Sequence, residues 1–219
     1  MEVLSTKLGR AIYLFPVRDM NPRGLDIWQI LSEITARYRF LKSPDLNAFI
    51  QGGGGPVEFN FGKFESERFG GIEVALQIHE DGLIADTEAS TSASEEFLND
   101  FIAWLVTEHG FTAPAQVKPL YLSELYVGSS DPFAKLIAKF DAFLSALTQS
   151  VDDELGRKME PVALNFGYEM TSALKTAANF RFERAIDAPN MKNRFFSSAN
   201  VTTESHLHLL GMLEAALNS

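Results

Sequence analysis

The sequence predicts an α+β fold of antiparallel sheets with helices packed on one face, in which one structural unit occurs twice. Three observations lead to this prediction. Apolar residues recur with strand spacing in some segments and with helical spacing in others. The order strand, helix, three strands and helix can be assigned over residues 1–110 and again over residues 111–219. Residues 56–62 and 161–167 are also identical at five of seven positions.

The first half begins with a strand followed by a helix. Residues 12–17 form an apolar run bounded by polar residues, which predicts a buried strand. Asn21 followed by Pro22 is typical of a helix start, because a capping side chain precedes proline at the first helical position. The helix behind it is predicted from apolar residues at helical spacing: Ile27, Leu31, Ile34 and Tyr38. Residues 40–55 are predicted to be a loop that ends in four glycines.

Three strands are predicted next, over residues 56–65, 72–78 and 83–89. The middle strand alternates apolar and polar residues, which indicates one buried face. Between it and the last strand stands Asp81-Gly82, the favoured pair for a two-residue hairpin turn, because both positions need a positive φ.

That turn would set the register of the hairpin. Ile78 would lie opposite Ala85, and Gln77 and Asp86 would share the opposite, more solvated face. A capping box of Ser92 and Glu95 then starts a helix that ends at Gly110. Its buried face is predicted to consist of Phe97, Phe101, Trp104 and Leu105.

The second half repeats this order. Residues 120–122 repeat the strand pattern of residues 12–14, and Asp131-Pro132 repeats the helix start. The helix behind it has an apolar stripe of Phe133, Ile137, Phe140, Leu144 and Leu147. Strands follow at residues 161–167 and 180–184, with a looser hairpin through Pro189-Asn190. Thr203 is expected to cap a last helix whose apolar residues are Leu207, Leu210, Leu213 and Leu217.

We therefore interpret residues 1–110 and 111–219 as a duplicated pair of units, pseudo-symmetric and packed together as one compact domain. The alternative is an α+β domain without a repeat. In a duplicated protein the groove between the halves would be the natural pocket.

Composition excludes several functional classes. The 219 residues carry a net charge of −10, which disfavours nucleic acid and anionic membranes as partners, because both attract positive charge. The absence of cysteine excludes disulfides, zinc ribbons and thiol catalysis. No apolar run is long enough to span a bilayer, and residues 1–10 lack a signal-peptide stretch. We therefore expect a cytoplasmic protein.

No motif predicts a catalytic residue, a metal site or a cofactor. The glycines at 52–55 are followed by Pro56 and a strand rather than a helix, so they do not form a phosphate-binding loop. His79 stands near Glu80, Asp81 and Asp86, but too few of these side chains would converge on a metal.

The remaining polar candidates are equally inconclusive. His206 and His208 are two residues apart on a predicted helix, so they do not share a face, and we expect them to be surface or partly buried side chains. The sequence also lacks the G-x-S-x-G signature of a nucleophilic serine. Three residues could be pocket carboxylates that the sequence does not bring together: Glu33, Glu124 and Glu169.

The distribution of charge is the most informative feature. Residues 57–110 contain twelve acids and only Lys63 and Arg68 as bases, a net charge of −10, whereas residues 170–200 carry +3. The first hairpin and its helix are therefore predicted to form one acidic face, which could simply be solvated. As a docking face it would comprise Glu73, Glu80, Asp81, Asp86, Glu88, Glu95, Glu96 and Asp100.

Two functions fit these observations. The first is a non-enzymatic module that binds a basic protein, such as an immunity protein that binds a nuclease toxin or a subunit of a larger assembly. On this hypothesis, reversing the charge at Asp86 and Glu88 to lysine mainly slows association and leaves folding intact or slightly improved. The alternative is a small-molecule-binding or enzymatic domain with its site in the groove between the halves. The sequence does not specify the oligomeric state.

Overall fold

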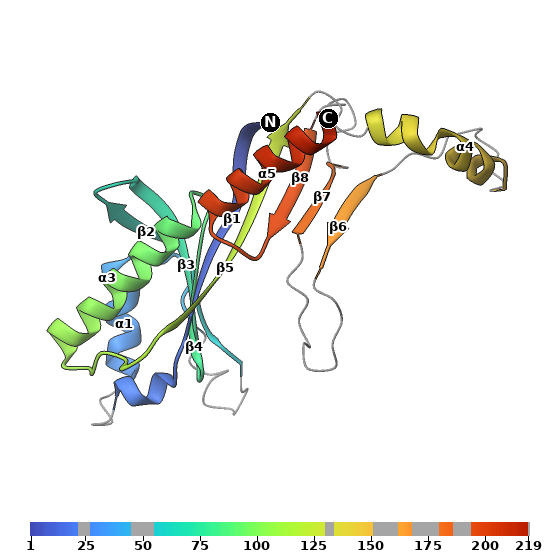
Figure 1. The fold of residues 1–219 in the computed structure, drawn as a ribbon. Coiled ribbons are helices and arrows are strands. Elements are labelled where there is room, and N and C mark those ends of the chain that lie inside the picture. The colour runs from blue at the N-terminus through green and yellow to red at the C-terminus, as the bar shows by residue number, and fades with distance from the viewer. Residues whose placement is uncertain are drawn as a thin grey trace. The chain divides into compact units, whose positions relative to one another are not determined.

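The computed structural model describes residues 1–21, 27–44, 55–129, 134–150, 162–167, 180–185 and 194–218. Its elements are β1 (Glu2–Leu14), the 3-10 helix η1 (Val17–Met20), α1 (Ile27–Arg37), β2 (Val57–Ser66), β3 (Gly70–His79), β4 (Gly82–Thr87), α3 (Thr91–His109), β5 (Lys118–Gly128), α4 (Ala134–Ser150), β6 (Ala163–Phe166), β7 (Phe180–Arg184), β8 (Arg194–Ala199) and α5 (Thr203–Asn218) (Figure 1). Some predictions concern residues outside the described ones: Pro22, the glycines at 52–54, Asp131-Pro132, Glu169 and Pro189-Asn190.

The strands form one eight-stranded sheet in the order β2-β3-β4-β1-β5-β8-β7-β6. Every strand pair whose register is defined is antiparallel. The predicted α+β class with an antiparallel sheet is therefore confirmed. β1 is longer than its predicted apolar run, because its polar first residues are also hydrogen-bonded strand.

The chain divides into two compact units that are not consecutive in sequence. The N-terminal unit comprises Thr6–Ser123 with Asn200–Thr203. The C-terminal unit comprises Met1–Ser5, Glu124–Ala199 and Glu204–Ser219. The divisions fall inside β1 and β5, whereas the sequence suggested a division near residue 110.

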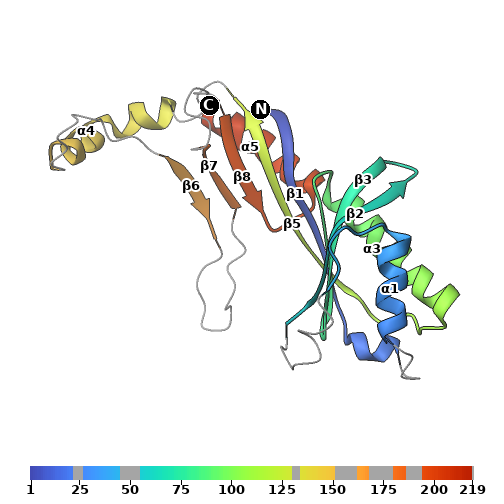
Figure 2. The same cartoon turned by 180° about the vertical axis from the view of Figure 1, so that it is seen from behind.

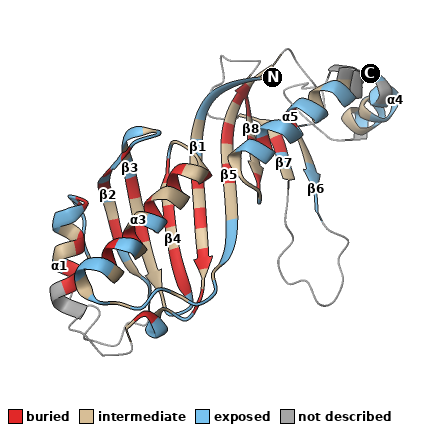
Figure 3. Ribbon diagram, turned by 60° about the vertical axis from the view of Figure 1, so that its left-hand side comes forward, coloured by how far each residue is buried: buried red, intermediate tan, exposed pale blue. Residues whose placement is uncertain are grey.

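In the N-terminal unit, α1 and α3 pack on the same face of the strands. Buried residues alternate with less buried ones along β3 and β4, as the predicted strand periodicity requires (Figure 3). Leu76 and Leu83 belong to the same buried cluster as Ile34 of α1 and Phe97 of α3. We call this face of the strands the inner face.

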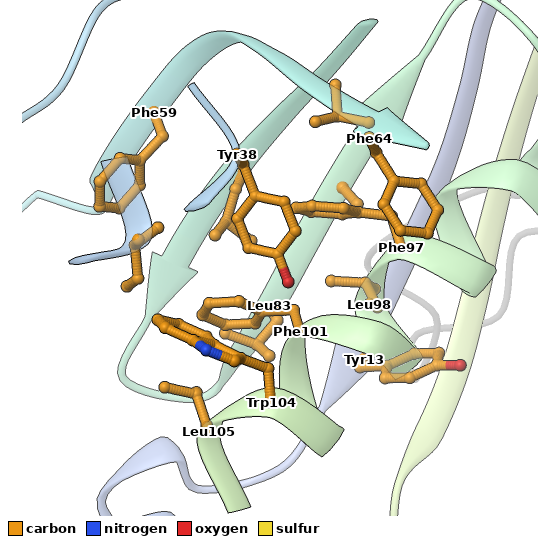
Figure 4. Packing of buried hydrophobic residues seen from close by; sticks show 14 of the residues in the cluster. Tyr13, Tyr38, Phe59, Phe64, Leu83, Phe97, Leu98, Phe101, Trp104 and Leu105 are labelled. Atoms are coloured by element: carbon orange, nitrogen blue, oxygen red, sulfur yellow. The ribbon is translucent and has the colours of Figure 1, made fainter. Parts of the chain in front are cut away.

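Aromatic rings form the centre of this core. Tyr38, just after α1, contacts Phe97 edge-to-face with ring centroids 4.9 Å apart, and also contacts Trp104 at 6.2 Å (Figure 4). Phe64 of β2 contacts Phe97 at 5.5 Å. Phe97, Phe101, Trp104 and Leu105 are all buried. The predicted apolar face of α3 is therefore confirmed.

The turn between β3 and β4 is one residue earlier than predicted. Glu80 and Asp81 form the turn, and neither has a positive φ. Gly82 instead belongs to β4, where a Cβ atom would lie 2.4 Å from the carbonyl oxygen of Tyr13. The glycine is therefore required by the close approach of β1, a constraint that the local turn motif does not reveal.

This change moves the hairpin register by two residues. Ile78 lies opposite Leu83 and not opposite Ala85, so the predicted pairing is wrong. Because side chains alternate with a period of two, Gln77 and Asp86 still share a face, as predicted.

α3 begins differently from the prediction. Its N-cap is Ser90, whose side chain accepts a hydrogen bond from the backbone N–H of Ala93. Ser92 and Glu95 therefore do not form the predicted capping box. The helix ends at Gly110, which has a φ of 67° in the left-handed region, and this C-cap confirms the predicted end.

In the C-terminal unit, β6, β7 and β8 lie side by side (Figure 1 and Figure 2). A small core contains Leu125, Val127, Phe182, Phe195 and Leu210. The N-terminal amine of Met1 forms an ion pair with Glu214 of α5. The core of this unit therefore combines residues from the start, middle and end of the chain.

The two helices of this unit bury fewer of their predicted apolar residues. On α4, Phe140 is 54 % exposed, so the predicted stripe is not covered at this position. Phe143, which is outside the predicted stripe, is 63 % exposed. On α5, Leu210 is buried but Leu207 is 40 % exposed. His206 occupies the buried position beside Leu207, which the spacing of leucines did not predict.

Candidate functional site

The eight acidic candidates lie on both sides of the sheet and do not form one face. Glu73 and Asp86 are on strand positions that alternate with buried inner-face residues, so they point away from α1 and α3. Glu80 and Asp81 form the adjacent turn, and Glu88 follows β4 directly. Three others belong to α3, on the inner side: Glu95, Glu96 and Asp100. The prediction of a single face is therefore wrong, because the sheet separates the hairpin acids from the helix acids.

We call the side of the strands opposite α1 and α3 the outer face. By register and alternation it contains Arg10, Ile12, Leu14, Glu58, Lys63, Glu65, Glu73, Ala75, Gln77, His79, Ile84 and Asp86. Its large apolar side chains, Ile12, Leu14 and Ile84, are outside the buried core cluster. Neither α-helix of the N-terminal unit covers this face.

Asp86 is not a free carboxylate. Arg10 lies opposite it on β1 and donates two hydrogen bonds, from Nε and Nη2, each 2.7 Å long. The two side chains are 29 % and 20 % exposed. A bidentate pair of this kind fixes both groups and neutralises the charge of Asp86. The partner is 76 residues away in sequence, so local charge counting could not find it.

We expect Asp86→Asn to lower the free energy of unfolding by about 1 kcal/mol, because it weakens a half-buried pair. Asp86→Lys should destabilise more, since two cations would then face each other on adjacent strands. From the sequence alone, charge reversal at Asp86 and Glu88 was not expected to destabilise the fold. With the Arg10–Asp86 pair in place, we expect the change at Asp86 to destabilise it. Urea unfolding of both variants, each also made with Arg10→Gln, measures the coupling. Equal losses with and without Arg10 would contradict this role.

Four of the predicted acids remain exposed and unpaired within the described chain. These are Glu73, Glu80, Asp81 and Glu88. Glu73 lies opposite Lys63 in the β2–β3 register, but no ion pair joins them. The hairpin turn therefore presents the adjacent carboxylates of Glu80 and Asp81. Glu88 lies at the other end of β4.

Glu95 is held by two tyrosines on the inner side. Tyr121 Oη donates to Glu95 Oε1 at 3.0 Å, and Tyr13 Oη lies 3.4 Å from the same oxygen and 2.9 Å from Asn99 Oδ1. Burial raises the pKa of Tyr13, and the charge of Glu95 raises it further. Both phenols therefore stay protonated and act as donors that tie α3 to β1 and β5.

Asp100 is held in a similar way. Tyr38 Oη donates to it at 2.7 Å, and Arg37 Nη2 lies 3.2 Å from both of its oxygens. Burial and this hydrogen bond raise the pKa of Tyr38. Of the three predicted site acids on α3, only Glu96 has no partner within the described chain, and it is half-buried.

The histidine of the hairpin has no metal-binding partners. His79 Nε2 lies 3.4 Å from Gln77 Oε1 on the same strand face. Within the described residues, no group of three or more histidine or acidic side chains could hold a metal ion. Of the other carboxylates considered, Glu33 lies 3.4 Å from His109 Nε2 at the end of α3, and Glu124 belongs to the C-terminal unit.

A buried serine–histidine pair was not predicted. Ser197 Oγ donates to the carbonyl of Arg181 at 2.9 Å and lies 2.8 Å from His206 Nε2. Because the single hydroxyl proton is used, His206 donates to Ser197 through Nε2. Both residues are fully buried, and burial lowers the pKa of His206 to about 4. The pair is inaccessible to a substrate and therefore serves packing.

A second feature missed by the sequence analysis is a pocket of about 230 Å³ at the end of α1. Its cationic residues are Arg37, Arg39 and Lys63. Arg37 and Arg39 are two residues apart at the end of α1, whereas Lys63 belongs to β2. In the sequence, only the run Arg37-Tyr38-Arg39 could have indicated this pocket.

No model of a known protein family matches the chain, and no curated protein shows significant similarity to it. Among the described helices, none combines the length and the apolarity needed to cross a bilayer.

Proposed function

We propose that the chain is a non-enzymatic interaction protein whose N-terminal unit binds a basic protein through its outer face. The observation that carries the proposal is the group of exposed, unpaired carboxylates Glu73, Glu80, Asp81 and Glu88, on or beside a sheet face that no described helix of this unit covers. The candidate site is therefore narrower than the sequence predicted. It excludes Glu95 and Asp100, which are held by tyrosines.

The outer face has the composition of a binding surface. Ile12, Leu14 and Ile84 supply apolar area beside the acidic hairpin. Protein interfaces commonly combine an apolar centre with a polar rim that excludes water. The Arg10–Asp86 pair lies among these residues and is already satisfied, so it adds no uncompensated charge.

Electrostatics would select the partner. Adjacent carboxylates repel each other, and lysine or arginine side chains of a partner would relieve that repulsion and form charge-assisted hydrogen bonds. An acidic patch also steers a basic protein during diffusion and raises its association rate. A basic toxin neutralised by this chain and a basic subunit of a larger assembly both fit this chemistry.

We also propose that the two halves arose by internal duplication. The strand order is symmetric about its centre. If each of β1, β2, β3 and β4 changes places with β5, β6, β7 and β8 respectively, the same order is obtained, read from the other edge of the sheet. The first residues of α3 and α5 also form a reciprocal pair. Thr91 N–H donates to Thr203 Oγ1 at 3.0 Å, and Thr203 N–H donates to Thr91 Oγ1 at 2.9 Å. Equivalent residues of a duplicated unit would make such a contact.

The docking proposal is tested with two variants of equal net charge. Glu80→Lys with Glu88→Lys reverses charge at the hairpin, whereas Glu96→Lys with Glu108→Lys reverses it on α3. Each form of the full chain is immobilised and exposed to lysate of the source cells, and retained proteins are identified. We expect a basic protein to be retained by the wild type and by the α3 variant but not by the hairpin variant.

Kinetics with that protein complete the test. We expect the hairpin variant to associate at least about tenfold more slowly at low salt, and the wild-type rate to fall as salt rises, since exposed charges act over about 8 Å at physiological ionic strength. Equal association rates for the two variants would show that the hairpin is only a solvated surface.

A further inference from the structure

The C-terminal end of α1 and the edge strand β2 form a basic pocket in an otherwise acidic unit. Arg37, Arg39 and Lys63 line it, together with Tyr38 and the carboxylates of Glu65 and Asp100. We propose that this pocket binds a phosphate dianion, either free or as the phosphate group of a monoester. Its lining contains none of the docking-site carboxylates, although Lys63 lies opposite Glu73 in the β2–β3 register.

One of the two acids of the pocket is already engaged. Asp100 accepts hydrogen bonds from Tyr38 and Arg37. A Cβ atom built on Gly71 would lie 3.3 Å from both carboxylate oxygens of Glu65, so this carboxylate lies over the β3 backbone. Asp100 is therefore paired, whereas Glu65 has no ion pair or side-chain hydrogen bond within the described chain. The unpaired side chains that line the pocket, Arg39, Lys63 and Glu65, carry a net charge of +1.

Arg39 and Lys63 are the cations left free. Both side chains are exposed, and neither has an ion pair or a side-chain hydrogen bond within the described chain. The backbone N–H of Lys63 donates to the carbonyl of Tyr38 at 2.6 Å. This bond holds Lys63 next to the residue that precedes Arg39, so the two cations are fixed on neighbouring backbone segments.

The backbone at Arg39 is unfavourable for an arginine. Its φ is 52°, in the left-handed region that favours glycine. It occupies the position after the α1 C-cap, where the N–H of Arg39 donates to Ala36 O and that of Phe40 donates to Thr35 O. These two bonds define a Schellman motif, whose left-handed residue is usually glycine. Arginine at this position sacrifices stability and supplies a cation to the pocket.

The chemistry of these groups fits phosphate. A guanidinium presents a planar set of donors that matches phosphate oxygens, and an ammonium adds a compact positive charge. Arg37 is oriented beside them, with its guanidinium carbon 5.3 Å from the centroids of Tyr38 and Trp104. The partial negative charge of the α1 C-terminus opposes an anion, but at about half an elementary charge it is smaller than the net charge of +1 carried by the unpaired side chains of the pocket.

The test uses backbone NMR of the full chain during titration with sodium phosphate and, separately, with phenyl phosphate. Sodium chloride at matched ionic strength serves as the reference. We expect saturable shifts at the amides of Arg39 and Lys63 with phosphate but not with chloride. Because Phe64 also lines the pocket, tighter binding of phenyl phosphate would identify a monoester as the ligand class, and equal affinities would identify the phosphate group alone.

Arg39→Gly separates binding from folding. Glycine relieves the left-handed strain, so the melting temperature should rise by a few degrees, while phosphate affinity should fall by about tenfold or more. Lys63→Gln should also weaken binding. Arg68→Ala is the matched control, because Arg68 is an exposed cation outside the pocket, and it should bind as the wild type does.

Two results would overturn the proposal. The first is the absence of saturable shifts at Arg39 and Lys63 with either phosphate compound. The second is an Arg39→Gly variant that is folded and binds phosphate with wild-type affinity.

Discussion

Replacing Phe97 with alanine is expected to lower the free energy of unfolding of the N-terminal unit by about 3–5 kcal/mol. Phe97 is fully buried and joins α3 to the sheet. Its ring contacts Tyr38 and Phe64 edge-to-face, and Phe101 at 6.3 Å. The variant loses these contacts and leaves a cavity that rigid strands cannot fill.

Urea unfolding followed by tryptophan fluorescence measures this loss, because Trp28 and Trp104 both belong to the N-terminal unit. The control is Phe143→Ala on α4, where the ring is 63 % exposed. That variant should change stability by less than about 0.5 kcal/mol. Similar losses for Phe97→Ala and Phe143→Ala would show that the aromatic cluster does not form the core.

The second large effect is a loss of stability of the C-terminal unit in acid, caused by His206. Burial lowers the pKa of His206 to about 4 in the folded chain, compared with an ordinary value of 6.5. Between these pH values the unfolded chain binds a proton that the folded chain does not. The contribution of neutral His206 to the free energy of unfolding is therefore complete above pH 6.5 and is lost as the pH falls towards 4. Its full size is about 3 kcal/mol.

Hydrogen exchange of β7 and β8 amides at pH 7 and pH 5 reports this effect. His206→Gln keeps a donor for Ser197 but does not titrate, so its stability should fall less between these pH values than that of the wild type. His208→Gln is the matched control, since His208 is exposed two residues away on the same helix. If His206→Gln loses as much stability as the wild type, His206 is not the acid-sensitive group.

Local sequence patterns predicted most of the individual elements. The alternation in residues 72–78 and the apolar spacing of Phe97, Phe101 and Trp104 correspond to β3 and α3. These patterns are informative because a strand or helix that buries one face must repeat its apolar residues with the period of its own backbone. Gly110 marked the end of α3 for an equally local reason, since it adopts a left-handed φ.

Details that depend on a second element were predicted less well. Gly82 was assigned to a turn because Asp-Gly favours one, yet its lack of a side chain is required by the backbone of Tyr13 in a neighbouring strand. Ser90 caps α3 although the Ser92–Glu95 spacing matched a capping box. Each segment offers two similar local motifs, two positions for the turn near Gly82 and two candidate caps for α3. Tertiary contacts decide which motif forms.

The sequence by itself determined the α+β class, the order of the elements and the excess of acids between residues 57 and 110. Only the tertiary structure decided which of those acids are free. Because side chains alternate along a strand, Asp86 lies on the outer face, where Arg10 pairs with it. Glu95 and Asp100 of α3 instead accept hydrogen bonds from tyrosines. Charge is a property of composition, but pairing and burial depend on residues that are distant in sequence and adjacent in space.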